Sequence, residues 1–150
     1  MDNQEVIKTL NDLIETCKDG EYGFRACAEQ ADALDLESLF VRRADECREA
    51  ARELQEQVVA LGGKADSGGT AAGALHRGWV SLRSKLSNYD DRAVLDECER
   101  GEDIAVKSYR DALAKPLPEL LRQMIERQYR GVQRNHDQIR GLRDGLRLSA

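Results

Sequence analysis

Aromatic residues and prolines are both scarce in this chain. Aromatic side chains make up 5% of its 150 residues and there are two prolines, whereas 34% of the residues are charged. Strands are enriched in aromatic and β-branched side chains, and a proline interrupts a helix interior. Because strand formers and helix breakers are both few, the composition favours long amphipathic helices, and we expect an all-α protein.

Further absences exclude whole classes of partner. No apolar stretch approaches the roughly 20 residues that cross a membrane, and the first ten residues, MDNQEVIKTL, are too polar for a signal peptide. The formal net charge of -5 argues against a nucleic-acid partner, since the arginines of the last predicted helix alternate with acidic residues. We therefore expect a cytoplasmic protein with neither a membrane nor a nucleic-acid partner.

The four cysteines have no CxxC spacing and no secretory context. Thiols in such a chain are normally reduced, and a free cysteine behaves as a small apolar residue. We expect buried, reduced thiols at Cys17, Cys27, Cys47 and Cys98. A thiol pair, or a site that combines cysteine with glutamate, is the alternative, because Cys17 and Cys98 each precede a Gly-Glu pair by about one helical turn.

The stretch CKDGE, Cys17 to Glu21, contains an Asp-Gly step of the kind that often marks a turn. The apolar pattern argues against a turn, because residues spaced alternately by four and by three continue through it in the same phase. These residues are Val6, Leu10, Leu13, Cys17, Gly20, Phe24, Cys27 and Ala31. The sequence therefore predicts one continuous helix across this stretch.

Glycine and proline mark the other helix boundaries. Gly62 and Gly63 end a second helix, and a stretch rich in Gly, Ser and Ala follows it. Pro116 and Pro118 separate the last two helices. The long helices are predicted at roughly 3–33, 36–61, 91–115 and 118–147, with a short helix at roughly 72–86.

The lengths of the links predict the topology. Short links join the first helix to the second and the third to the fourth, which makes two antiparallel hairpins, whereas the middle link is long. At 150 residues the chain can bury about two-thirds of its unfolded surface as one domain. We therefore expect a single domain over residues 1–150, a ferritin-like antiparallel four-helix bundle whose long crossover contains the short helix.

A motif similar to CKDGE, CERGE, occurs in the third predicted helix. In both copies the glycine lies on the apolar stripe, and the glutamate, Glu21 or Glu102, replaces an apolar residue in the neighbouring row. A half-buried carboxylate needs a hydrogen bond, an ion pair, a proton or a cation. One interpretation is a metal or small-ligand site, and another is plain exposure to solvent. The third is a structural contact with an arginine or with Gln128, Asn135 or His136.

Small residues recur at the same depth of the predicted bundle. A glycine within a helix costs about 1 kcal/mol relative to alanine, so it needs a reason such as the close approach of a neighbouring helix. We expect the helices to form a narrow waist at Gly20, Ala50, Ala51, Gly101 and Gly131.

Part of a known metal site is present at this depth. Ferritin-like di-iron proteins carry a single Glu on each of two helices and a Glu-x-x-His pair on each of the other two. Glu21 and Glu102 fit the single positions. The pair is missing from the second helix, where Cys47 stands, and the fourth helix keeps only His136, with Gln133 in place of the glutamate. We therefore expect no dinuclear centre.

The same comparison limits what can be assigned. No catalytic residue is assigned and no cofactor is expected. If a divalent ion such as Fe, Mn or Zn does bind, the candidate ligands are Glu21, Glu102 and His136.

Three longer motifs resemble the signatures of a known family. They are DGEYGF at 19–24, GALHRGW at 73–79 and ECERGED at 97–103. Over essentially its whole length the sequence is similar to a bacterial family of chains of this size, an uncharacterised domain of unknown function placed among ferritin-like four-helix bundles. The resemblance implies the fold and no activity.

These observations leave two functions open. We expect a non-catalytic structural or interaction protein with a degenerate ferritin-like site, associated with bacterial stress by analogy with the fold alone. The alternative is a metal-binding or redox protein that uses Glu21, Glu102 and His136. A homo-oligomer or a complex with a protein partner is compatible with either function.

Overall fold

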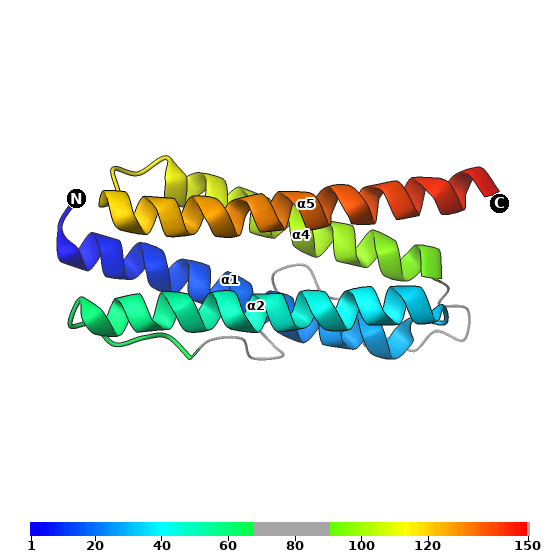
Figure 1. Cartoon of the computed structure of the whole chain (residues 1–150), viewed down its shortest axis with the longest axis horizontal. Helices are drawn as coiled ribbons and strands as arrows, with labels where there is room; N and C mark the ends of the chain where they lie inside the picture. Colours follow the sequence, from blue (N-terminus) through cyan, green and yellow to red (C-terminus); the bar gives the residue numbers. More distant parts are fainter. Residues whose placement is uncertain (68–90, 150) are drawn as a thin grey trace.

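The computed structural model describes residues 1–67 and 91–149 of the chain. Four long helices make up this part: α1 (Asn3–Gln30), α2 (Leu34–Ala60), α4 (Asp91–Leu113) and α5 (Glu119–Ser149). They form two antiparallel hairpins, α1 with α2 and α4 with α5 (Figure 1). The all-α class and the four long helices are confirmed, whereas the short helix predicted at 72–86 lies outside the described residues.

Helix α1 runs without interruption through the CKDGE motif, as the apolar phase predicts. It begins with a capping box, in which the Glu5 backbone N–H donates to the Asp2 carboxylate at 2.8 Å and the Asp2 N–H donates to the Glu5 carboxylate at 3.0 Å. Gly20 lies buried in the middle of the helix. The Asp-Gly step is therefore not a turn.

The first hairpin turns earlier than the sequence predicts. Ala31 and Ala33 are extended, with ψ angles of 134° and 130°, so α1 ends at Gln30 rather than at 33 and α2 begins at Leu34 rather than at 36. The reason lies in α4. The Asp91 carboxylate accepts hydrogen bonds from the backbone N–H groups of Asp32, at 2.8 Å, and Ala33, at 3.2 Å. Such a distant contact leaves no trace in a local pattern.

The second hairpin turns at Pro116 and Pro118, as predicted, although α4 ends at Leu113 rather than at 115. Arg122, in the first turn of α5, donates hydrogen bonds to the backbone carbonyls of Leu113, at 2.9 Å, and of Lys115. The last carbonyls of a helix have no partner within the helix. Arg122 therefore satisfies the Leu113 carbonyl at the end of α4, and it also contacts the Lys115 carbonyl in the link, which accepts from the Leu117 N–H as well.

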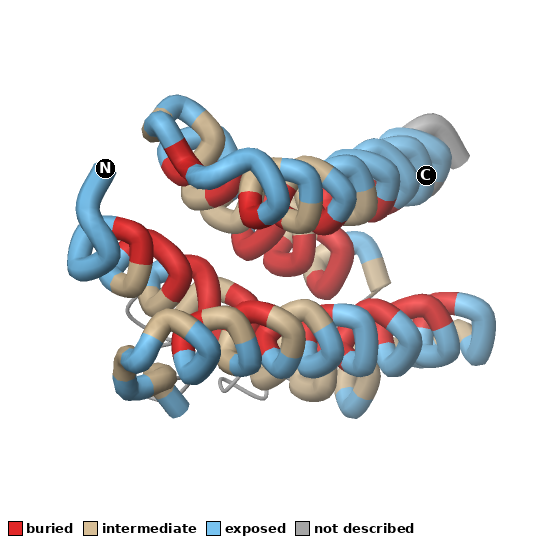
Figure 2. The backbone as a smooth tube through the Cα atoms, turned by 60° about the vertical axis from the view of Figure 1, so that its left-hand side comes forward, coloured by how far each residue is buried: buried red, intermediate tan, exposed pale blue. Residues whose placement is uncertain are grey.

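Two apolar clusters form the core. The first includes Leu10, Leu54 and Ile125, and the second packs Phe24 on Phe40, with ring centroids 6.3 Å apart. Figure 2 shows that the buried residues of the helices face the interior of the bundle. Polar side chains are also buried in the middle of the bundle, and they include Asp19, Arg43, Glu102, Gln128, Asn135 and His136.

The two hairpins contact each other unevenly. Helix α1 packs against α4, whereas α2 and α5 lie farther apart along the described part of the chain. Across that side the two helices are joined by side chains, among them the ion pair between Glu53 of α2 and Arg127 of α5. The bundle is therefore closed on one side and open on the other.

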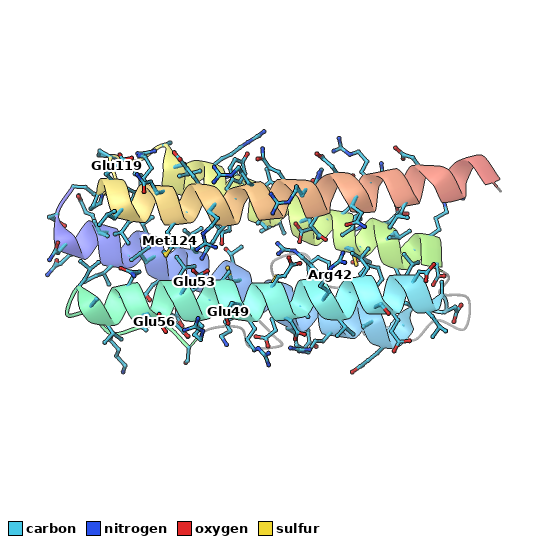
Figure 3. All side chains as sticks on the ribbon, viewed as in Figure 1. Arg42, Glu49, Glu53, Glu56, Glu119 and Met124 are labelled. Carbon is cyan, nitrogen blue, oxygen red and sulfur yellow. The ribbon has the colours of Figure 1, made fainter. Side chains whose placement is uncertain are left out.

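Charged side chains cover the outer faces of the helices (Figure 3). Arg52 of α2 contacts both Glu49 and Glu56, and Lys8 of α1 pairs with Asp12 at 3.0 Å. Ion pairs as exposed as these contribute little to stability. None of the four described helices is both long enough and apolar enough to cross a membrane.

Gly20 determines how closely α1 approaches α2. A Cβ atom at this position would lie 3.0 Å from Cys47 Sγ, whereas a Cβ atom at Gly131 of α5 would meet only Arg134 Nη2, at 3.7 Å. Alanine gains about 1 kcal/mol over glycine within a helix, so Gly131→Ala should raise the free energy of unfolding. Gly20→Ala should be at least about 1 kcal/mol less stable than Gly131→Ala in urea unfolding, because its methyl group overpacks Cys47.

Truncation of the neighbour tests this cause. In the double variant Gly20→Ala/Cys47→Ala the thiol that the new methyl group meets is absent, so the two substitutions should be less destabilising together than the sum of their separate effects. Equal stabilities of Gly20→Ala and Gly131→Ala would contradict the close contact.

Candidate functional site

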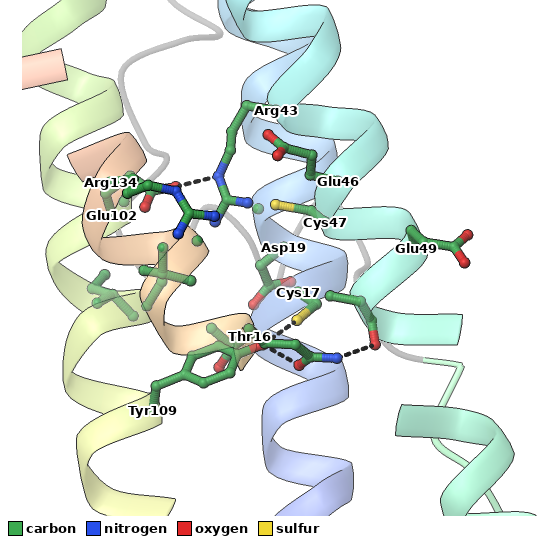
Figure 4. A pocket seen from close by; sticks show the side chains of 18 of the residues that line it. Thr16, Cys17, Asp19, Arg43, Glu46, Cys47, Glu49, Glu102, Tyr109 and Arg134 are labelled. Carbon is green, nitrogen blue, oxygen red and sulfur yellow. Dashed lines mark hydrogen bonds and ion pairs between the residues drawn. The ribbon is translucent and has the colours of Figure 1, made fainter. Parts of the chain in front are cut away.

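A pocket of about 360 Å³ lies in the middle of the bundle, on the side where α2 and α5 stand apart (Figure 4). All four described helices contribute to its wall. The wall combines small or apolar residues with polar ones, including Ala50, Gly101, Ala105, Val132, Arg43, Glu102, Tyr109 and Gln128. A concave site with apolar walls and a few polar groups is typical of small-molecule binding.

A buried ion pair forms one polar part of this pocket. Arg43 on α2 donates from Nε to Oε1 of Glu102 on α4 at 3.1 Å, and the two residues are only 6% and 1% exposed. The Arg43 guanidinium also lies over the Phe24 ring, 5.8 Å from its centroid. Removal of one partner from such a pair leaves the other charge buried and uncompensated, which costs more than removal of both.

Burial disfavours the charged form of the Glu102 carboxylate. Burial raises the pKa of Glu102, and Arg43, Asn135 and His136 offset that effect only in part. The second carboxylate oxygen, Oε2, has no hydrogen bond of normal geometry within the described part of the chain. Since arginine stays charged throughout the pH range in which proteins fold, Glu102 is the member whose charge depends on pH.

A chain of hydrogen bonds ties another part of the wall together. The Tyr109 hydroxyl donates to Gln128 Oε1 at 2.8 Å and lies 3.3 Å from Cys17 Sγ. Gln128 Nε2 donates to the Ala50 carbonyl at 3.4 Å and to the Glu53 carboxylate at 3.3 Å, both on α2. These contacts link all four described helices, so α2 and α5 are connected although they do not pack closely.

The small residues at this depth do not form the narrow waist predicted from the sequence. Gly20, Ala50, Gly101 and Gly131 line the pocket, and a side chain at Gly131 would find open space apart from Arg134. Among the glycines whose surroundings are described at this depth, Gly20 makes the predicted close approach, to Cys47, whereas Gly131 leaves room for the cavity. Ala51 is buried in the first apolar cluster instead.

Of the three metal ligands predicted from the sequence, Glu21 lies outside the pocket wall. It is half-buried and pairs within α1, with Lys18 at 3.6 Å and with Arg25 at 3.3 Å. Arg25 in turn pairs with Asp45 of α2 at 3.0 Å. Glu21 therefore belongs to a network of ion pairs that joins α1 to α2, and its contacts are those of a structural carboxylate.

The structure also gives Glu102 and His136 different partners. Glu102 pairs with Arg43, whereas His136 Nε2 lies 2.5 Å from Asp103 Oδ1. Within residues 1–67 and 91–149, one group of three potential ligands has all its ligand atoms within 4.8 Å of one another, and it consists of Glu99, Asp103 and His136. Of the three predicted ligands, His136 alone belongs to that group.

The chemistry of this group fits a divalent metal only in part. Two carboxylates one turn apart on α4 and an imidazole from α5 are ligands that Zn²⁺ or Mn²⁺ accepts. Glu99, however, is also in contact with the Arg143 guanidinium, and Arg140 Nε lies 3.9 Å from its Oε1. Two guanidinium groups beside one ligand supply positive charge that opposes the binding of a cation.

Reasoning from the sequence missed Arg43, whose charge dominates the pocket. A signal was available, because Arg43 stands seven residues from both Leu36 and Ala50 and so replaces an apolar residue in its row, just as Glu102 does on α4. Asp103 carries no such signal, since it is exposed on a highly charged helix.

All four cysteines are buried free thiols, which confirms the prediction. The pairing of Cys17 with Cys98 considered from the sequence is not formed, because Cys98 Sγ contacts Cys27 Sγ at 2.7 Å and Cys17 contacts Tyr109. Burial raises the pKa of Cys17 to about 11 and that of Cys47 to about 12, and it also raises the pKa of Cys98.

Comparisons with known proteins agree with this architecture. Residues 5–115 match the model of a family described as a domain of unknown function, DUF2383. No curated protein matches the sequence.

Two solved structures share the fold. One is a mutant of Dps1 from Mycobacterium smegmatis, with a TM-score of 0.77 and 12% identity over 94% of this chain and 96% of that one. The other is a dodecameric thioferritin, the bacterioferritin-related protein from Bacteroides fragilis, with a TM-score of 0.79 and 16% identity over 99% and 90%. The ferritin-like four-helix bundle is therefore confirmed, and at these identities the likeness extends to the fold alone.

Arg43→Met should lower the free energy of unfolding by about 3 kcal/mol at neutral pH, because it leaves the Glu102 carboxylate buried without its partner. The double variant Arg43→Met/Glu102→Leu should recover most of that loss. Glu21→Gln removes only a partly exposed pair on α1 and should change the stability by less than about 1 kcal/mol. Urea unfolding measures each value, and a loss for Arg43→Met no larger than that for Glu21→Gln would contradict the buried pair.

The same variants should differ in their response to pH. Because the folded pKa of Glu102 lies above its unfolded value, its contribution to stability is fully present below the unfolded pKa and is lost as the pH rises through the folded pKa. The charged form of Glu102 is the form that Arg43 stabilises. The loss caused by Arg43→Met should therefore be smallest in acid, where Glu102 is protonated, and should grow toward neutral pH. The variant that also carries Glu102→Leu should show no such trend.

The raised pKa values predict unreactive thiols. At pH 8 a thiol with a pKa of about 11, such as Cys17, is ionised in roughly one molecule in a thousand, and burial also keeps reagents away. Iodoacetamide should therefore modify no cysteine of the native chain on a timescale in which all four react in denaturing urea. Mass spectrometry counts the adducts, and rapid modification of any one thiol before unfolding would indicate a reactive cysteine instead.

Proposed function

The chain belongs to the DUF2383 family, and we propose that it is a non-catalytic structural or interaction protein built around a degenerate ferritin-like centre. The observation that carries the proposal is the buried ion pair between Arg43 and Glu102. Ferritin-like metal proteins hold metal ions in the middle of the bundle, between carboxylates of facing helices. In this chain a guanidinium supplies the positive charge beside the mid-bundle carboxylate.

The set of available donors supports the same proposal. A dinuclear site needs about four carboxylates and two imidazoles. Cys47 and Ala50 occupy the stretch of α2 where a Glu-x-x-His pair is required, and Gln133 takes the place of the glutamate that should precede His136. A metal ion placed against the Arg43 guanidinium would also be repelled.

A protein of this kind acts through its surfaces or its assembly rather than by turnover. The Bacteroides fragilis neighbour is described as dodecameric, and we propose that this chain also self-associates. Light scattering should then give a mass that is a multiple of 16.8 kDa, and a monomer at all concentrations would rule self-association out. An association with bacterial stress and a cytoplasmic location are proposed on the fold and the sequence alone.

Metal binding is the second candidate, and one observation favours it. His136 lies in a single group of potential ligands with Glu99 and Asp103. One Zn²⁺ or Mn²⁺ ion could be held there once Glu99 exchanged its contact with an arginine for the metal. The set formed by Glu21, Glu102 and His136 would instead require the ion pairs of both glutamates to break.

Metal analysis separates the two candidates. Protein purified without a chelator, incubated with Fe²⁺, Mn²⁺ or Zn²⁺ and then desalted, should retain well under one metal ion per chain. A chelator should leave its melting temperature unchanged, because a ligand that binds only the folded state would raise that temperature. The parent protein is compared with two variants, His136→Ala and Glu102→Gln.

The variants assign any metal that is retained. One ion per chain that is lost in His136→Ala but kept in Glu102→Gln would favour the second candidate and its ligands on α4. Stoichiometric Fe²⁺ whose retention and oxidation depend on Glu102 would overturn the non-catalytic proposal.

A further inference from the structure

The pocket contains hydrogen-bond donors that no described residue satisfies. Arg43 uses Nε for its bond to Glu102, and its guanidinium makes no other hydrogen bond along the described part of the chain. The remaining N–H groups are on Nη1 and Nη2, and guanidinium N–H groups of this kind often donate paired hydrogen bonds to a carboxylate. These groups are not sealed off from solvent, so water or a ligand in the pocket can accept their hydrogen bonds.

A second arginine stands at the mouth of the same pocket. Arg134 of α5 lines the pocket and has no ion-pair partner within the described residues. Its Nη2 atom lies 3.7 Å from the place where a Cβ atom of Gly131 would stand, so the side chain folds back along its own helix. Figure 4 draws Arg134 among the side chains that line the pocket, together with Arg43 and Glu102.

The charges of these three side chains do not balance. Arg43 and Arg134 carry two positive charges and Glu102 carries one negative charge, which leaves one positive charge unmatched. The other acidic residues of the described wall have different surroundings. Glu49 and Glu53 are paired with other arginines, and Asp19 is buried and has interactions of its own. Glu46 is exposed to solvent, and its charge contributes to raising the pKa of Arg43.

The rest of the wall is suited to an apolar group. Cys47, Ala50, Ala105 and Val132 present small hydrophobic surfaces, and Gly101 presents none. The volume of about 360 Å³ is at the low end of the roughly 300–1,000 Å³ of small-molecule sites. Such a pocket suits a compact ligand, of the size of a chain of about eight carbons or a single aromatic ring.

We propose that the pocket binds a small organic monocarboxylate. Its carboxylate accepts hydrogen bonds from the free N–H groups of Arg43 and lies against Arg134, and its apolar body lies along Ala105 and Val132. This inference goes beyond the proposed function, which assigns the pocket no ligand, so the two can fail separately.

Isothermal titration with octanoate tests the proposal. The parent protein should bind one octanoate per chain in a saturable manner, with a dissociation constant below about 1 mM. Octylamine has the same apolar chain with the opposite charge, and acetate has the carboxylate without the chain. Neither of these should show saturable binding in the same range.

Two substitutions remove the two parts of the recognition, and each has a matched control on α5. Arg134→Gln removes the charge at the mouth, whereas Arg130→Gln removes a charge that does not line the pocket. Gly131→Leu fills the pocket, whereas Gly141→Leu adds the same side chain at an exposed position with open space around it. Octanoate binding should weaken at least tenfold in the first member of each pair and stay unchanged in the second.

Several outcomes would overturn the proposal. They are no saturable binding of octanoate up to roughly 10 mM, equal binding of octylamine, and undiminished binding in Arg134→Gln. Arg134 is exposed and forms no ion pair with another described residue, so this last variant should fold normally and keeps the test decisive even if Gly131→Leu is destabilised. Binding that weakens equally in Arg130→Gln would indicate adsorption to the charged surface, which also contradicts the proposal.

Discussion

The buried ion pair between Arg43 and Glu102 is the constraint on which the middle of the bundle depends. Two charges removed from water must face each other, so α2 and α4 are held in register at this level although they belong to different hairpins and the two residues are 59 positions apart. Apolar packing cannot continue unbroken through a charged level, and the core accordingly consists of two clusters. The pair thus divides the core and fixes the relative position of the hairpins.

The pocket follows from the same constraint. Where a charged pair replaces interlocking apolar side chains, and the residues around it are as small as Gly101, Ala105 and Gly131, the space between four helices is not filled. Helices α2 and α5 remain apart there and are joined by polar contacts such as that of Gln128 with Glu53. The cavity is therefore produced by the helices themselves, which hold its polar and apolar groups at fixed positions.

The helices could be predicted from the sequence because their signals are local. The unbroken apolar phase excludes a turn in CKDGE, whereas the first link, which is predicted a few residues too late, accepts a cap from Asp91 of another helix. The site could not be predicted in the same way. Apolar phase gives the face on which a residue lies, so Glu102 is detectable as a charge in an apolar row. Apolar phase does not give the relative shift and rotation of the two hairpins. These decide that Arg43 pairs with Glu102, whereas Glu21 pairs with Arg25 of its own helix.

The proposed replacement of a metal by an arginine would change what such a centre can do. A metal ion can be lost, exchanged or reduced, whereas a guanidinium is attached to the chain, stays charged and has no second oxidation state. The centre is complete as soon as the chain folds, and the N–H groups that Glu102 leaves free can only donate hydrogen bonds. A fixed charge with directional donors and apolar walls is suited to the recognition of an anion rather than to the transfer of electrons, which is why we propose a binding role for this bundle rather than redox chemistry.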